Sequence, residues 1–166
     1  TSPFTAKWLV FLHAAREGTV DRREDNIISP MKGAGLLNKP AAKYTITYAD
    51  GSSSSAPISR RHEINSFSKG WGENTIRAVP HLSPAAVHQH HEQQRVADPV
   101  PVGSWGQSQT RVSYNHYLPW LNQLYAWENP HPTREITTIE CRADTDEVFL
   151  FGLCAGNVET NPLRWE

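Results

Sequence analysis

The residues best suited to chemistry are the histidines of the segment His88-Gln89-His90-His91-Glu92. Histidines two positions apart on an extended segment point to the same side, so His88 and His90 could bind a divalent metal ion. The zinc-protease pattern His-Glu-x-x-His would begin at His91, but Arg95 stands where its second histidine belongs. Because no further ligands lie at a matching distance, we favour a solvated loop and predict no metal site. His88, His90 and His91 remain the candidates for an alternative, a small metal-dependent hydrolase.

Other catalytic patterns are incomplete. The chain has no Gly-x-Ser-x-Gly elbow, and Gly103-Ser104-Trp105-Gly106 has the wrong spacing for one. Cys141 falls in the middle of an expected strand, where a structural thiol is the default. Glu63 and Glu128 could serve as the two carboxylates of a glycosidase, but the sequence does not bring them together. We therefore predict no catalytic residue and a chain that is not an enzyme.

A polar row in Arg60-Arg61-His62-Glu63-Ile64-Asn65 is the best candidate for binding. If this segment is extended, alternation places Arg61, Glu63 and Asn65 on one face. Such a row offers donors and acceptors for vicinal hydroxyls or for a uronate carboxylate. A solvated strand face with an internal Arg–Glu ion pair explains the pattern equally well.

Aromatic residues could complete this site. An indole ring can stack on the apolar face of a sugar ring, and Trp71, Trp105 and Tyr117 are the candidates. Trp105 lies between two glycines in a polar setting, so we expect it to be exposed. We expect Trp127, beside Leu124 and Tyr125, to be buried or half-buried.

Composition narrows the class of protein. The 166 residues include 16 basic and 17 acidic side chains, a net charge of −1 that indicates no nucleic-acid partner. No apolar run is long enough to cross a bilayer, so we expect no membrane segment. The length suits one domain spanning residues 1–166. Because the chain lacks an initiator methionine, we expect it to be processed or cut from a larger protein.

Strand patterns with turn signals between them predict an all-β fold. Trp8 to His13 is a continuous apolar run typical of a strand buried in a sandwich. The segment Lys43 to Tyr48 alternates, with Tyr44, Ile46 and Tyr48 on one face, and Asp50-Gly51 predicts the turn after it. Pro57 places the return strand at a sheet edge. The pattern favours an antiparallel β-sandwich.

The last two expected strands, Ile136 to Cys141 and Val148 to Leu153, are interpreted as a hairpin that turns near Asp144-Thr145-Asp146. In that register Cys141 would pair with a residue near Leu150 rather than with Cys154. We therefore expect two free, buried thiols and no disulfide.

The run Trp127-Glu128-Asn129-Pro130-His131-Pro132 with Ile136 and Ile139 resembles a motif of jelly-roll accessory domains, which are galactose-binding-like in fold. These domains occur in bacterial carbohydrate-active enzymes and in multidomain metallohydrolases, and we accordingly expect a secreted or extracytoplasmic bacterial protein. Further pieces appear in the expected order over most of the chain, outside residues 81–109: Trp8 to His13, Tyr44 to Gly51, Ile58, Arg60-Arg61, Ile64, Trp71 and Asn161 to Arg164.

The resemblance implies a non-catalytic carbohydrate-binding module that targets a parent enzyme to a polysaccharide or oligosaccharide. Such folds can hold a structural calcium ion, although no Asp-rich run here demands one. The alternative is a structural interaction domain that packs on the catalytic domain of the same parent chain. That alternative predicts an apolar surface left bare on the isolated domain.

Overall fold

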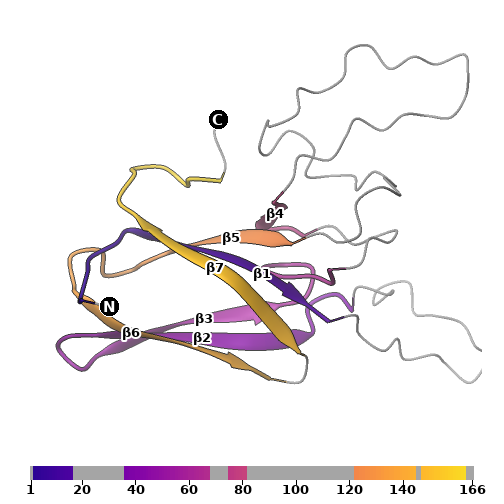
Figure 1. Ribbon diagram of the computed structural model, residues 1–166, viewed down its shortest axis with the longest axis horizontal. Helices are drawn as coiled ribbons and strands as arrows, with labels where there is room; N and C mark the ends of the chain where they lie inside the picture. The colour runs from indigo at the N-terminus through magenta and orange to yellow at the C-terminus, as the bar shows by residue number, and fades with distance from the viewer. Residues whose placement is uncertain (1, 17–35, 68–74, 82–121, 145–146, 164–166) are drawn as a thin grey trace, which may run out of the picture.

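The computed structural model describes residues 2–16, 36–67, 75–81, 122–144 and 147–163, and these ranges contain only strands, turns and extended segments. Two antiparallel sheets lie against each other as the layers of a sandwich (Figure 1). One sheet has the order β4-β5-β1-β7 and the other β3-β2-β6. The strands are β1 (Trp8–Ala15), β2 (Pro40–Tyr48), β3 (Ser53–Ser59), β4 (Ala78–Pro80), β5 (Gln123–Glu128), β6 (Ile136–Ala143) and β7 (Val148–Gly156). The predicted all-β sandwich is confirmed.

Strand β1 is a central strand of the four-stranded sheet, with β5 on one side and β7 on the other. Its run of apolar residues fits that place, since Leu9 and Phe11 on the inner face are fully buried. Phe11 lies opposite Tyr125 of β5 and Leu153 of β7.

Among the described residues there is no helix with the length and apolar character needed to cross a membrane.

The hairpin of β2 and β3 forms as predicted. Tyr44, Ile46 and Tyr48 are buried between the sheets, and the turn at Asp50-Gly51 places Gly51 at φ 82°, a left-handed conformation that glycine adopts without steric cost. Strand β3 is an edge strand, as predicted from Pro57. At an edge, the missing backbone N–H of a proline does not interrupt the hydrogen bonds between two central strands.

The expected hairpin of the last two strands is wrong. Strand β6 pairs with β2 in one sheet, and β7 pairs with β1 in the other. The chain therefore changes sheets between Ala143 and Val148, where the local turn signal predicts a return within one sheet. Both strands end up at sheet edges, on the same side of the sandwich.

The core between the sheets is aromatic around the middle of β1. The Phe11 ring lies 4.7 Å from the Tyr44 ring and 6.4 Å from the Tyr125 ring, measured between centroids. His13 stacks on Tyr125 with its ring nearly parallel, at 4°. Trp127 is buried as expected and closes one end of the same core. Burial of these large side chains is the main stabilising contribution of such a sandwich.

Candidate functional site

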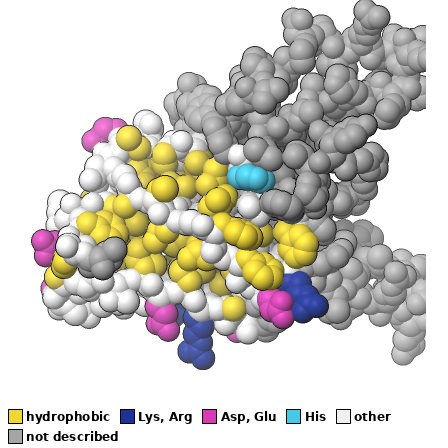
Figure 2. Space-filling model, in the orientation of Figure 1, with side chains coloured by type: hydrophobic (Ala, Val, Ile, Leu, Met, Phe, Trp, Pro, Cys, Tyr) yellow, Lys and Arg dark blue, Asp and Glu magenta, His cyan; other side chains and the backbone are white. Residues whose placement is uncertain are grey.

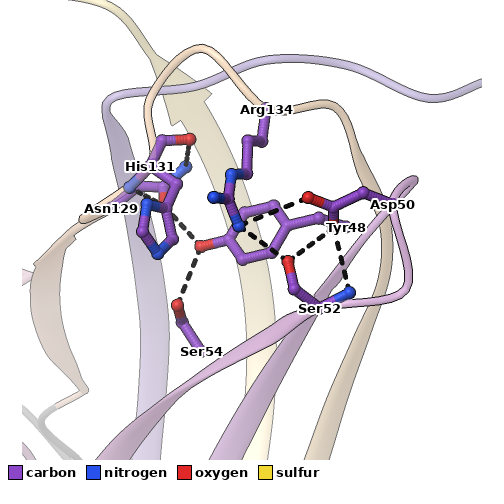
Figure 3. A network of polar contacts seen from close by, with 7 residues as sticks. All are labelled: Tyr48, Asp50, Ser52, Ser54, Asn129, His131 and Arg134. Atoms are coloured by element: carbon purple, nitrogen blue, oxygen red, sulfur yellow. Dashed lines mark hydrogen bonds and ion pairs between the residues drawn. The ribbon is translucent and has the colours of Figure 1, made fainter.

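One end of the sandwich is closed by Asn129, which follows β5 and precedes the Pro130 corner (Figure 3). Its Oδ1 accepts hydrogen bonds from the Tyr48 hydroxyl at 2.6 Å and from the His131 backbone N–H at 2.9 Å. Its Nδ2 donates to the carbonyls of Ala6 at 2.8 Å and His131 at 3.1 Å. Asn129 is buried, and all four hydrogen-bonding positions of its amide are used. We call these contacts the Asn129 corner.

The outer part of this end carries charge. Arg134 lies over the Tyr48 ring at 5.9 Å, donates to Ser52 Oγ at 2.8 Å and lies 3.3 Å from Asp50 Oδ2 (Figure 3). The hydroxyl and backbone N–H of Ser52 lower the pKa of Asp50 below its usual value, and the nearby Arg134 adds to this. These contacts order the β2–β3 turn against the chain between β5 and β6. The polar side chains at this end are therefore bonded to one another.

The other end contains the predicted binding row, and its segment is a turn rather than an extended strand. The Ser59 carbonyl accepts from the backbone N–H groups of His62, Glu63 and Ile64, which curls the chain after β3. Arg61 takes φ 62°, a left-handed conformation that is unfavourable for a residue with a Cβ. The extended interpretation of Arg60 to Asn65 is therefore wrong, and so is the shared solvent-facing row.

The structure does bring Arg61, Glu63 and Asn65 into one turn, but it buries Glu63 and Asn65. Glu63 Oε2 accepts from the Ser59 backbone N–H at 3.0 Å, and Glu63 Oε1 lies 3.2 Å from the guanidinium of Arg77. Arg61 is half-buried, and its Nε has no hydrogen-bond partner in the described structure. Neither the Oδ1 nor the Nδ2 of Asn65 has a partner there either. We call this segment, residues 59–67, the 59–67 turn.

His13 connects β1 to this turn. Its Nε2 lies 2.9 Å from the Glu63 carbonyl oxygen and its Nδ1 lies 2.7 Å from the Tyr44 hydroxyl. A carbonyl oxygen can only accept, so Nε2 carries the proton, and neutral Nδ1 accepts from Tyr44. Burial lowers the pKa of His13 to about 4, although the bond to Glu63 opposes this. Burial likewise raises the pKa of Tyr44, with a further contribution from Cys141, so both groups are neutral at pH 7.

Six of the predicted residues lie outside the described ranges: Trp71, Trp105, Tyr117, His88, His90 and His91. Their roles in binding sugar or metal stay predictions. Among the described residues, no group of three or more His, Cys, Asp or Glu side chains is arranged to hold a metal ion.

Both cysteines are free, and both are exposed rather than buried. Cys141 lies on the edge strand β6 and Cys154 on the edge strand β7, so neither is covered by a further strand in the described part of the chain. The expectation of buried thiols failed because it placed both strands inside one hairpin. Burial of part of its side chain still raises the pKa of Cys141, helped by the neighbouring Glu140.

An apolar surface runs along β7. Phe149 is 42% exposed, Leu150 44%, Phe151 56% and Leu153 38%, and Val158 just beyond the strand is 53% exposed. Figure 2 shows hydrophobic side chains gathered in the middle of the face on which β7 lies. The ring centroids of Phe149 and Phe151 lie 6.4 Å apart, and Phe67 packs edge-on against Phe149. We call the five exposed residues the β7 surface.

The β7 surface reaches into the space between the sheets. Leu150 and Leu153 pair with His13 and Phe11 of β1, so they face inward, and yet both are exposed. On the facing sheet, Cys141 pairs with the inward-facing Tyr44 and is exposed too. The described sandwich is thus open along its β6–β7 side. The signal in the sequence was the run Val148 to Gly156, which contains no charged residue.

In comparisons with known proteins, no family model, characterised relative or solved structure matches this chain.

Proposed function

We propose that this chain is a non-catalytic β-sandwich domain that binds another protein through its β7 surface. The observation that carries the proposal is the exposure of Phe149, Leu150, Phe151 and Leu153 together on one edge strand. Isolated apolar residues are common on protein surfaces, but a contiguous apolar strip is typical of an interaction site. A catalytic domain of the same parent chain would be one protein of this kind.

The energetics favour a covered β7 surface. If a large apolar side chain offers about 200 Å² of surface, the exposed fractions of these five residues correspond to roughly 400 Å². Covering that area would contribute on the order of 10 kcal/mol before the entropic cost of association is subtracted. An exposed apolar edge strand also invites aggregation, which a bound protein would prevent.

Carbohydrate binding, the function that the resemblance implies, receives less support from the described residues. Glu63 is engaged by Ser59 and Arg77, and Asn65 is fully buried, so neither presents a free polar group to a sugar at the surface. Carbohydrate binding and the jelly-roll subtype stay predictions. A glycan array, repeated with calcium and with chelator and with Trp71 and Trp105 changed to Ala, would test the sugar site.

The test of the proposed function is photocrosslinking at single positions. A photoreactive phenylalanine analogue in place of Phe151 should give a covalent adduct with a protein when cells that make the full chain are irradiated. The same analogue at Ser55 on the exposed edge strand β3 is the matched control and should give none. If position 151 yields no protein adduct, or no more than position 55, the proposed function is wrong.

A further inference from the structure

We propose that Asp50-Gly51 is a site of isoaspartate formation and that the fold slows this modification. Ser52 and Arg134 hold the carboxylate of Asp50, and the turn between β2 and β3 holds the backbone N–H of Gly51. The proposal goes beyond the proposed function and does not depend on it, because none of these residues belongs to the β7 surface.

The pair Asp50-Gly51 places the two reacting groups next to each other. The backbone nitrogen of Gly51 can attack the carboxyl carbon of the Asp50 side chain and form a C–N bond. The carboxyl hydroxyl and the amide proton leave together as water, and a five-membered imide ring remains. Glycine favours this ring closure, because it has no side chain that shields its nitrogen or restricts its backbone.

A water molecule then opens the imide ring at one of its two carbonyl carbons. Opening at the side-chain carbonyl restores aspartate. Opening at the backbone carbonyl gives isoaspartate, in which the chain runs through the former side-chain carboxyl carbon and the former backbone carbonyl is a free carboxylate. One water molecule leaves and one enters, so the isomerisation needs no other reactant.

Burial does not protect this site. The side chain of Asp50 is 53% exposed and Gly51 is exposed too, so water reaches both reacting groups. Any protection therefore has to come from the hydrogen bonds and the ion pair of the turn.

The attacking nitrogen is engaged in the folded protein. The Gly51 N–H donates to the Tyr48 carbonyl at 3.0 Å, and the Tyr48 N–H donates to the Ser52 carbonyl at 2.9 Å, which closes the same turn. The amide has to release its proton when the ring forms, so the bond from Gly51 to Tyr48 must break first. The nitrogen therefore becomes available only when the turn opens.

The carboxyl group is engaged as well. Asp50 Oδ1 accepts from the Ser52 N–H at 2.9 Å and from the Ser52 hydroxyl, and Oδ2 lies 3.3 Å from Arg134 (Figure 3). These contacts, those of Ser52 above all, favour the charged form and lower the pKa of Asp50. The neutral acid is the reactive form, because a carboxylate has no hydroxyl to release as water. The same contacts thus fix the carboxyl group and reduce the population that can react.

Isomerisation would act on the Asn129 corner. Isoaspartate adds one carbon atom to the backbone of the turn and moves the free carboxylate to a different carbon. Arg134 would lose its contact with this carboxylate, although it lies over the ring of Tyr48, whose hydroxyl binds Asn129. We therefore expect the isoaspartyl form to unfold at a lower urea concentration than the unaltered protein.

The first experiment compares the folded and the unfolded chain. The purified protein is kept for days in neutral buffer at body temperature, with and without guanidinium chloride. Methylation by an isoaspartyl methyltransferase measures the isoaspartate, and peptide mapping with electron-transfer fragmentation assigns it to a residue. Position 50 should isomerise several-fold faster in the unfolded chain. Equal rates in the two states, or no isoaspartate at position 50 in the unfolded chain, would overturn the proposal.

The second experiment tests the contacts of the carboxylate by substitution. Ser52→Ala removes the hydroxyl and Arg134→Leu removes the cation, whereas Ser53→Ala is the matched control, because Ser53 is an exposed serine next in the chain. The measured quantity is the rate in the folded protein divided by the rate in guanidinium chloride, which removes the effect of the sequence itself. Circular dichroism confirms that each variant is folded in buffer.

This ratio should rise several-fold in Ser52→Ala and in Arg134→Leu and should stay unchanged in Ser53→Ala. If neither Ser52→Ala nor Arg134→Leu raises the ratio above that of Ser53→Ala, the contacts of the carboxylate do not protect the site and the proposal is wrong.

Discussion

The two ends of the sandwich handle their buried polar groups in opposite ways. At the Asn129 corner, one buried amide makes four hydrogen bonds that join β2, β5 and the chain before β1. At the 59–67 turn, a second buried amide, that of Asn65, makes none within the described structure, and Arg61 next to it has a left-handed backbone. A buried asparagine thus holds strands together at one end, whereas at the other end it has no hydrogen-bond partner in the described structure.

The difference shows why a polar motif can predict fold better than function. A buried amide with all its partners stabilises one arrangement of the chain, and it leaves nothing for a ligand. A buried amide without partners costs free energy, since it has lost its bonds to water. Substitution of the two asparagines by the same apolar residue separates these roles.

The largest effect is expected from Asn129→Leu. The change removes four hydrogen bonds. It leaves the Ala6 carbonyl and the His131 N–H without these partners and leaves the Tyr48 hydroxyl with Ser54 alone, so it should lower the free energy of unfolding by about 3 kcal/mol or more. Urea denaturation followed by circular dichroism measures the loss. Asn157→Leu is the control, because Asn157 is exposed and accepts a single bond from Lys7. If Asn129→Leu and Asn157→Leu lower the free energy of unfolding equally, the hydrogen bonds of the Asn129 corner do not stabilise the fold.

The second effect is a pH dependence that comes from His13. Its pKa is about 4 in the folded protein against 6.5 when unfolded, so the unfolded chain binds the proton more readily. Stability should therefore be complete above pH 6.5, fall as the pH drops, and level off below pH 4, with a total loss of about 3 kcal/mol. Urea midpoints between pH 7.5 and 3.5 would reveal this slope.

The matched variant for this titration is His13→Gln, whose amide can still donate to the Glu63 carbonyl and accept from Tyr44. The variant should be less stable at pH 7. Its free energy of unfolding should also change less between pH 6.5 and 4, because the imidazole that titrates in that range is gone. If the slope between pH 6.5 and 4 is the same in both proteins, the titration belongs to other groups.

The smallest effect, and the one with the opposite sign, is expected from Asn65→Leu. Because neither polar atom of Asn65 has a partner in the described structure, an apolar side chain of similar size removes a desolvation cost and should raise the free energy of unfolding by about 1 kcal/mol. The comparison with Asn129→Leu uses the same substitution and the same assay. A loss at position 65 like that at position 129 would show that Asn65 has partners in solution, such as an ordered water.

The elements that the sequence predicted well are those with a local physical cause. Alternation placed Tyr44, Ile46 and Tyr48 on the buried face, the Asp50-Gly51 pair placed the turn, and Pro57 placed β3 at an edge. The pairing of β6 and β7 failed because a turn signal near Asp144 is local, whereas the sheet that the next strand joins depends on contacts with β1, more than 130 residues away in the chain.

The candidate site was less accessible to sequence reasoning. Alternation along Arg61, Glu63 and Asn65 assumed an extended backbone, but three hydrogen bonds to the Ser59 carbonyl curl the segment. The apolar run of β7 predicted a strand, and its composition would have suited a covered one. The apolar run alone could not reveal that β7 lies at a sheet edge with its large side chains exposed. The exposure of a strand depends on how the strands are arranged in space.

The place of β1 has a consequence for how the protein is made. This strand is the first of those described, whereas its neighbours β5 and β7 begin only at Gln123 and Val148. At about 5 to 20 residues per second, the ribosome needs on the order of ten seconds to produce the partners of Trp8-Leu9-Val10-Phe11-Leu12 after these residues have been joined. During that interval the most apolar strand of the nascent chain has no sheet to enter, which makes it a natural binding site for a chaperone.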